Sequence, residues 1–177
     1  MISERTLRLL PVKVGYDTMS SPVGELTILA SQAGLHAVLW DVAIETLKRK
    51  NLPIVWRSVK DYPIIVQTQK QLSEYFEGKR KTFDLPLALQ GTGFQMQAWQ
   101  QLLKIPYGQT LSYGEQAQRL GDKNKSRAVG LANGCNPISI IVPCHRVIGS
   151  KGQLIGFAGG LDKKAYLLTL EQKHHST

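Results

Sequence analysis

The sequence changes character at a short polar segment rich in glycine, residues 90–93. Before this segment, apolar and polar residues alternate with the two-residue period of β-strands. After it, apolar residues recur at helical spacing behind sequences of the helix-capping type. Glycine and polar residues at such a boundary are typical of a linker. The pattern predicts an α+β protein of two small domains, residues 1–90 and residues 91–177.

The first ninety residues predict a small sheet with two helices. Alternating stretches separated by short turns of Ser, Pro and Gly favour an antiparallel meander. The three strands are expected over residues 12–18, 25–30 and 35–40. A short helix is expected over residues 41–50, a further strand over 54–56, and a longer helix over 64–76. This half contains no cluster of catalytic residue types.

The residues after the linker predict three helices. Thr92 with Gln95, and Ser112 with Glu115, have the spacing of capping boxes that open the first two. The third is expected over residues 125–134, and a tight polar turn before it completes a helix-turn-helix candidate. Its side chains are mostly small, which allows close approach to another helix or to a narrow groove. The pattern alone leaves both open.

An apolar run, residues 140–142, leads into Pro143, Cys144 and His145. The run predicts a short buried strand or the edge of a loop, and the proline restricts the backbone that presents the cysteine. A thiol reacts as a thiolate, and a neighbouring imidazole is the usual group that removes its proton. A structural cysteine beside a surface histidine is the alternative.

Net charge and cysteine content narrow the class of protein. A formal charge of +9 and a pI near 9.7 suit a polyanionic partner. For a soluble protein, nucleic acid is the first candidate for that partner. Cys135 and Cys144 are too few for a disulfide scaffold and lack zinc-finger spacing. The sequence has no apolar run of about 18 residues and no signal peptide. We therefore expect a cytoplasmic protein with reduced thiols, no metal and no membrane partner.

The motif Ile-Ile-Val-Pro-Cys-His-Arg-Val at residues 140–147 resembles the active-site motif of the O6-alkylguanine-DNA alkyltransferases, the methylated-DNA–protein-cysteine methyltransferases. Asn136-Pro137 before it and residues 156–160, Gly-Phe-Ala-Gly-Gly, after it also match that family. The resemblance implies a small ribonuclease-H-like sheet domain, residues 1–90, whose role is support, followed by a mostly helical domain, residues 91–177, that binds DNA and accepts the alkyl group. It implies that O6-alkylguanine, and also O4-alkylthymine, is flipped out of duplex DNA. The alkyl group then passes irreversibly to Cys144, one lesion per molecule, in a monomer without a cofactor.

The resemblance also implies roles for the residues around the thiol. His145 takes the thiol proton through a water, and Glu171 orients the histidine. Tyr113 rotates a phosphate and donates a proton to the leaving base, while Asn136 ties the third helix to the active-site turn. The base pocket is expected to include the Val147 carbonyl, the amides of Cys144 and Ala158, Phe157 and Gly159. Phe157 and Ala158 stand where relatives often have Tyr and Ser, which leaves the preference among adducts open.

The DNA contacts are placed on the third helix by the same resemblance. Arg127 enters the base stack while the helix lies in the minor groove. The remaining contacts are expected at Tyr113, Lys125, Ser126, Ala128 and Gly130.

Asp162 is expected to cap a helix over residues 163–170, which would leave Glu171 at an end where its charge opposes the helix dipole.

Three other functions fit parts of the sequence. A sensor of alkylated DNA would not react, but such proteins carry tryptophan in place of Cys144. A Cys-His-Glu hydrolase would need an oxyanion hole and turnover, and would have no use for Arg127 among small residues. A transcription regulator would need base-reading side chains that the third helix lacks.

Overall fold

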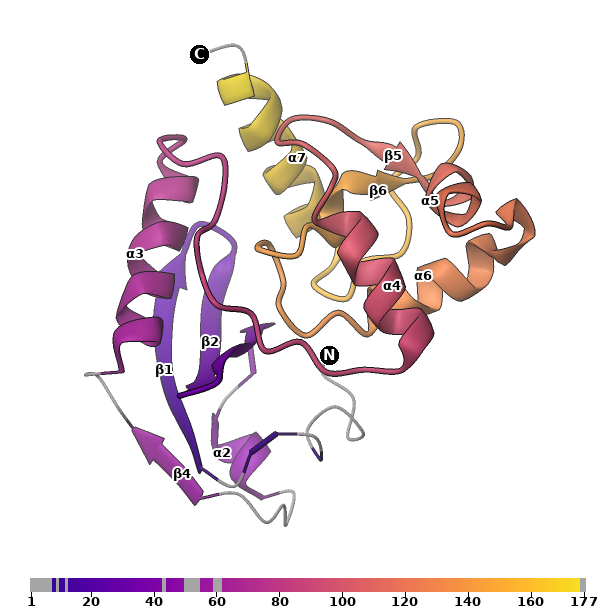
Figure 1. The fold of residues 1–177 in the computed structure, drawn as a ribbon. Coiled ribbons are helices and arrows are strands. Elements are labelled where there is room, and N and C mark those ends of the chain that lie inside the picture. Colours follow the sequence, from indigo (N-terminus) through magenta and orange to yellow (C-terminus); the bar gives the residue numbers. More distant parts are fainter. Residues whose placement is uncertain are drawn as a thin grey trace. The chain divides into compact units, whose positions relative to one another are not determined.

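The computed structural model describes residues 8, 10–11, 13–42, 44–49, 55–58 and 62–175, without the side chains of residues 56–58. Contacts between Cα atoms divide the chain into two compact units, one ending at Gln90 and the other beginning at Gly91 (Figure 1). Each unit is described by itself below.

The N-terminal unit is built on a four-stranded sheet with the order β3-β2-β1-β4. Its strands are β1 (Lys13–Ser21), β2 (Gly24–Ser31), β3 (Gly34–Trp40) and β4 (Val55–Ser58). The pairs β1–β2 and β2–β3 are antiparallel, which confirms the predicted meander. The fourth strand pairs parallel with β1, an arrangement that local pattern does not specify. Ile54, placed at the start of the expected fourth strand, lies outside the described residues.

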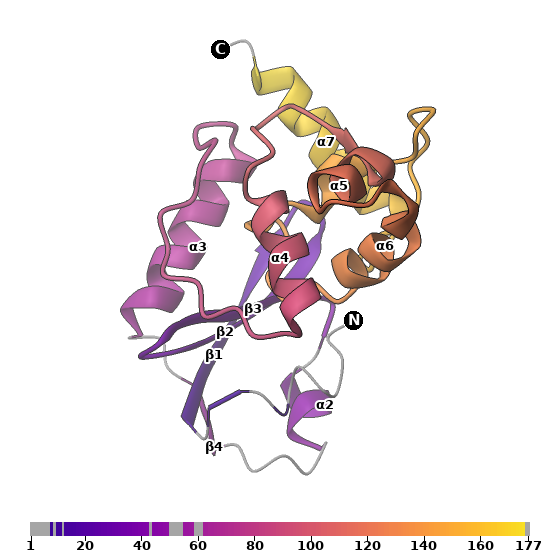
Figure 2. The ribbon, with the colours of Figure 1, turned by 45° about the vertical axis from the view of Figure 1, so that its right-hand side comes forward.

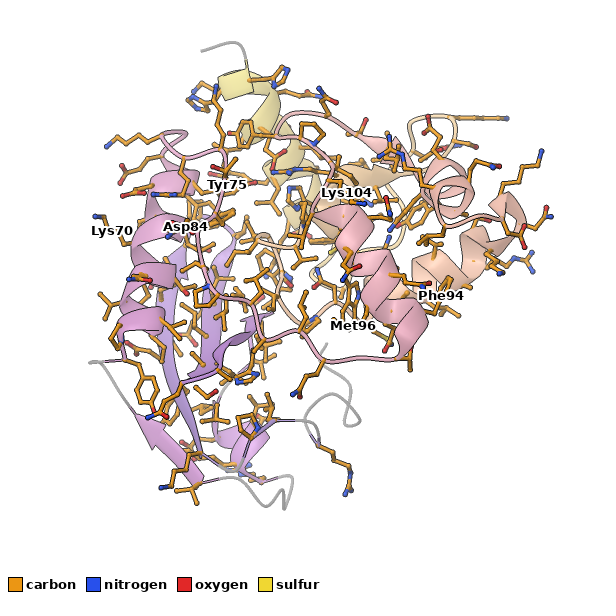
Figure 3. All side chains as sticks on the ribbon, viewed as in Figure 1. Lys70, Tyr75, Asp84, Phe94, Met96 and Lys104 are labelled. Atoms are coloured by element: carbon orange, nitrogen blue, oxygen red, sulfur yellow. The ribbon has the colours of Figure 1, made fainter. Side chains whose placement is uncertain are left out.

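Among the described residues of this unit two helices accompany the sheet, α2 (Ile44–Lys48) and α3 (Pro63–Phe76). Helix α3 packs on one face of the sheet through Ile65, Thr68, Leu72 and Tyr75, which recur at helical spacing and are fully buried (Figure 1). Figure 3 shows Tyr75 turned toward the sheet and Lys70 pointing into solvent. The expected helix over residues 64–76 is therefore confirmed within one residue.

The segment before the linker is attached to the start of β3. Leu35 N–H donates to the Pro86 carbonyl at 2.8 Å, and Ala88 N–H donates to the Leu35 carbonyl at 2.9 Å. Gly34 has a φ of +138°, and a Cβ there would lie 2.5 Å from the Pro86 carbonyl oxygen. Only glycine permits both that backbone and that approach.

The C-terminal unit consists of helices around a two-stranded parallel sheet (Figure 2). The helices are α4 (Gly93–Leu102), α5 (Tyr113–Arg119), α6 (Ser126–Gly134) and α7 (Leu161–His175), with 3-10 turns η1 (Lys123–Lys125) and η2 (Cys144–Arg146). The strands are β5 (Leu111–Ser112) and β6 (Val147–Ile148). Both capping boxes, Thr92 with Gln95 and Ser112 with Glu115, are present as predicted.

Buried amide side chains hold α4, α5 and α6 together. Gln116 Nε2 donates to the Ala98 carbonyl at 3.1 Å, and Asn133 Nδ2 donates to Gln116 Oε1 at 2.8 Å. Trp99 Nε1 donates to the Ala132 carbonyl at 2.8 Å. Because each donor is buried with its acceptor, the helix-turn-helix formed by α5 and α6 has a fixed geometry on α4.

The apolar run at residues 140–142 forms a turn in which Ile140 takes a φ of +70°, so of the two structures expected for this run the loop is confirmed. The prediction for the last helix is wrong. The last helix starts at Leu161, so Asp162 lies in its first turn, and it continues to His175, so Glu171 lies inside it. Burial of Glu171 against other side chains, described next, outweighs the tendency to end the helix at this position.

Candidate active site and nucleic-acid interface

Cys144 is presented by a compact turn. The Pro143 dihedrals, φ −83° and ψ 66°, with the Cys144 N–H donating to the Val142 carbonyl at 2.8 Å, define an inverse γ-turn. Asn136, just after α6, donates from Nδ2 to the same Val142 carbonyl at 2.7 Å and accepts from the Ile138 N–H at 3.0 Å. Asn136 thus joins the end of α6 to the turn that carries the thiol. The Cys144 amide, expected to bind the leaving oxygen, is engaged within this turn.

A buried carboxylate organises the residues that follow the thiol. Glu171 Oε1 accepts from His145 Nε2 at 2.7 Å, and Arg146 donates to both Glu171 oxygens from Nε and Nη2 at 2.9–3.2 Å. The Gly108 N–H donates to Glu171 Oε2 at 3.0 Å. Burial alone would raise the pKa of Glu171, but hydrogen bonds from His145 and Arg146 and the charge of Arg146 hold that pKa well below its usual range. The carboxylate is therefore ionised at neutral pH.

His145 is neutral and has one ring nitrogen to spare. Burial lowers the pKa of His145, and the neighbouring Glu171 offsets that effect only in part. The ionised carboxylate can only accept, so Nε2 carries the proton of the neutral ring. His145 Nδ1 is buried and has no hydrogen-bond partner among the described residues. The tautomer thus leaves the Nδ1 lone pair able to accept a proton.

Lys164 is a site residue that sequence reasoning missed. Its side chain is fully buried, and Nζ donates to the Val147 carbonyl at 2.6 Å and to the Ile155 carbonyl at 2.7 Å. Burial lowers the pKa of Lys164 to about 8, although the nearby Cys144 favours the charged form. The sequence signal that could have identified Lys164 is its helical spacing. Lys164, Leu167 and Glu171 recur three and four residues apart and are the buried residues of α7.

Two opposing effects act on the pKa of the Cys144 thiol. Burial raises the pKa of Cys144 above its ordinary value, while the Asn136 hydrogen bond and the Lys164 charge lower it. Cys144 is 8% exposed, so the sulfur lies at the edge of the interior. A thiol in this position needs both a base and a nearby cation to form a thiolate at neutral pH.

Tyr113 stands at the start of α5 and borders a pocket. Its hydroxyl is 3.0 Å from both the Ile155 and Gly156 carbonyls, and Lys164 Nζ lies 5.7 Å from its ring centroid. Burial and the neighbouring Cys144 raise the pKa of Tyr113 to about 12, so the phenol stays protonated. A Cβ on Gly156 would lie 3.0 Å from the Tyr113 oxygen, and its φ of +58° also favours glycine.

The pocket has a volume of about 310 Å³ and brings together residues from α5, α6 and the loop before α7. It is lined by Tyr113, Ser126, Arg127, Gly130, Ile155 and Gly156. The first four were predicted to contact DNA, whereas Ile155 and Gly156 were missed.

The residues predicted for the base pocket, Val147, Phe157, Ala158 and Gly159, are not among those that line this cavity. Val147 is buried with its carbonyl bound by Lys164, and Ala158 is exposed.

The predicted DNA-contacting helix exposes its cations. Lys125 and Arg127 are exposed, while Ser126, Ala128 and Gly130 are half-buried. Because Arg127 lines the pocket from α6, any polyanion bound along this helix would pass the pocket mouth.

Within the described part of the chain, two kinds of feature are absent. No group of three or more His, Cys, Asp and Glu side chains there could hold a metal ion. No helix there is long and apolar enough to cross a membrane.

Comparison with known proteins agrees with this geometry. Residues 14–89 match the model of the 6-O-methylguanine DNA methyltransferase ribonuclease-like domain, and residues 93–173 match that of the DNA binding domain of the same family. The methylated-DNA–protein-cysteine methyltransferase of Methanosarcina barkeri is 43% identical over 90% of this chain and 98% of that protein. The chain belongs to the 6-O-methylguanine DNA methyltransferase family. The resemblance of residues 140–147 and the predicted fold class are thereby confirmed.

Other members of this methyltransferase family are similar along nearly the whole chain. The Mycolicibacterium paratuberculosis methylated-DNA–protein-cysteine methyltransferase is 44% identical over 91% of this chain and 94% of that protein. The crystal structure of Mycobacterium tuberculosis OGT in complex with DNA has a TM-score of 0.78 and 43% identity, covering 92% of this chain and 94% of that one.

Proposed function

We propose that this protein repairs alkylated DNA by accepting an alkyl group from O6 of guanine, or O4 of thymine, onto Cys144. The observation that carries the proposal is the setting of the thiol. Cys144 stands in a turn fixed by Asn136, beside the His145–Glu171 pair and the buried Lys164, and close to Tyr113 on the pocket. The family's DNA binding domain and the DNA complex of the Mycobacterium tuberculosis relative support duplex DNA as the partner.

The alkylated base must leave the helix before it can meet a thiol. Extrusion costs a few kcal/mol, and less for a damaged base that pairs badly. In this proposal α6 lies in the minor groove, and Arg127 fills the space left in the base stack. Lys125 at the start of α6 contacts the backbone, and Ser126, Ala128 and Gly130 let the helix approach closely. Tyr113 turns the neighbouring phosphate so that the base enters the pocket.

Transfer then proceeds by one in-line displacement. His145 Nδ1 takes the Cys144 proton through a water, and Glu171 stabilises the resulting imidazolium. The thiolate forms an S–C bond to the alkyl carbon as the C–O6 bond breaks, with that electron pair going to guanine. Tyr113 protonates the guanine ring, and the proton held on His145 later restores the phenol. The products are a Cys144 thioether and ordinary guanine.

The reaction has no step that regenerates the thiol. A thioether is not hydrolysed by acid–base groups of this kind, so each molecule repairs one lesion. The alkyl donor is the DNA itself, and no cofactor enters the balance.

The experiment that tests this function is a titration of stoichiometry. A duplex with one O6-methylguanine is supplied in excess, and repaired duplex is counted against protein. We expect one repaired duplex per protein and none with Cys144→Ser, with Cys135→Ser as the matched control that repairs normally. Continued turnover would indicate a hydrolase, and binding without any repair would indicate a sensor.

A further inference from the structure

The DNA-facing side of α6 carries an exposed leucine. Leu131 is 76% exposed, the most of any exposed large hydrophobic residue within the described ranges, where the next reach 48%. Exposing a leucine to this degree forgoes the stabilisation that its burial would give. It is the kind of residue that contacts a partner when it stands on a binding face.

Leu131 shares its face with Arg127. Residues four apart on a helix differ by about 40° around the axis and about 6 Å along it. Val129, Ala132 and Asn133 form the opposite, buried side of α6. The outward stripe therefore consists of Arg127, Gly130, Leu131 and Gly134, that is, one cation, one apolar side chain and two glycines.

The two glycines on this stripe are not required by packing within the protein. A Cβ on Gly134 would meet nothing within 4 Å, and one on Gly130 would make only ordinary contact with Tyr113 at 3.7 Å. Glycine disfavours a helix relative to alanine. Both glycines are explained if an external surface approaches the helix backbone on either side of Leu131.

We infer that Leu131 is a second DNA-contacting residue, which inserts between the deoxyribose walls of the minor groove beside Arg127. This inference rests on the proposed function. Leucine is among the apolar wedge residues of minor-groove binders, and an apolar side chain packs against the sugar faces of the groove. Along the groove, about 6 Å corresponds to roughly two base-pair steps. Leu131 would therefore fix the register of the helix on the DNA after Arg127 has entered the stack.

The setting of the stripe favours duplex DNA as the occupant. No acidic residue occurs in α6, and Lys123, Lys125 and Arg127 are exposed in the turn and first residues that lead into it. A protein partner that covered Leu131 would need a negative surface around an apolar one. The minor groove supplies both, since phosphates line its edges and sugars its walls.

The test compares Leu131→Ala with Leu103→Ala, a control leucine that is 45% exposed at the end of α4. Dissociation constants for duplex DNA are measured at two salt concentrations. We expect Leu131→Ala to weaken duplex binding about fivefold to tenfold without changing the salt dependence, because an apolar contact releases no counterions. Leu103→Ala should bind like the wild type.

A second variant separates binding from folding. Gly134→Ala should raise the melting temperature, because alanine is the better helix former, yet weaken duplex binding by crowding the groove. Alkyl transfer from free O6-alkylguanine base should be unchanged in both variants, since neither Leu131 nor Gly134 lines the pocket.

The outcomes distinguish a failure of this inference from a failure of the proposed function on which it rests. Duplex affinity unchanged by Leu131→Ala and Gly134→Ala, in protein that still accepts alkyl groups, would overturn the inference and leave the function standing. Wild-type protein that accepts no alkyl group from duplex or free base would overturn the function itself.

Discussion

The two units of this protein bury different kinds of polar groups. Among the described residues, the buried polar side chains of the N-terminal unit are neutral groups of Ser, Thr, Gln and His. The C-terminal unit buries Arg146, Lys164 and Glu171, all fully or nearly fully. Burying charge is costly, and replacing a buried ion pair by apolar residues is often neutral or stabilising. The difference indicates that the C-terminal charges are kept for chemistry, whereas the N-terminal polar groups serve the fold.

The largest effect should follow from breaking the charge network. Glu171→Gln keeps the shape but leaves Arg146 without its counter-charge, so we expect a loss of about 3–5 kcal/mol in the free energy of unfolding of the C-terminal unit. Urea unfolding followed by Trp99 fluorescence measures it, with Glu115→Gln on the exposed start of α5 as the control. A loss below about 1 kcal/mol would contradict a network that is tightly coupled.

The same network determines how the stability of the C-terminal unit changes in acid. The folded-state pKa of Glu171 is depressed, so its contribution to stability is complete above the unfolded pKa near 4.3 and falls away as the pH drops below that value. The wild type should therefore lose this part of its stability in acid, and the difference between wild type and Glu171→Gln should narrow there.

A smaller effect, measured in reactivity, is expected at Lys164. Lys164→Met removes the cation near the thiol, and we expect transfer from free O6-alkylguanine to slow about tenfold at pH 7. Because the pKa of Lys164 is about 8, its charge disappears as the pH rises through that value, and the advantage of the wild type should shrink. Rate profiles between about pH 6.5 and about pH 9.5 test this. A ratio of rates that stays constant with pH would mean that Lys164 acts only by holding the Val147 and Ile155 carbonyls.

The smallest effect should come from the N-terminal unit. Ser31 Oγ lies 2.8 Å from His36 Nε2, and both side chains are buried. Ser31→Ala should cost about 1 kcal/mol of unfolding free energy, the usual value of one neutral hydrogen bond, and leave the alkyl-transfer rate unchanged. A slowed transfer in this variant would show that the N-terminal unit does more than support.

Local sequence predicted most of the elements. Periodicity located β1, β2, β3 and α3, and the Thr92 and Ser112 capping boxes located the starts of α4 and α5. These signals succeed because they depend on neighbours in the chain. Features that depend on distant partners were missed, such as the parallel pairing of β4 with β1.

The residues of the candidate active site fall into the same two groups, those indicated by local sequence and those that depend on distant partners. Cys144 and His145 are adjacent in sequence and stand out in any reading of the motif. Arg146 lies in that motif, but its bond to Glu171 spans 25 residues, and the Ile155 carbonyl joins Tyr113 and Lys164 across a loop. For residues 140–142 the local pattern left a strand and a loop open, because apolar β-branched residues favour strands locally, while the hydrogen bonds of Asn136 impose a turn.

The most direct test of the account is to locate the transferred methyl group. Wild-type protein is incubated with a duplex that contains one O6-methylguanine, digested, and the peptides are mapped by mass spectrometry. We predict a single methyl group, on the sulfur of Cys144, with Cys135 unmodified. A methyl group on Cys135, or repaired DNA with both thiols unmodified, would contradict the assignment of Cys144 as the acceptor.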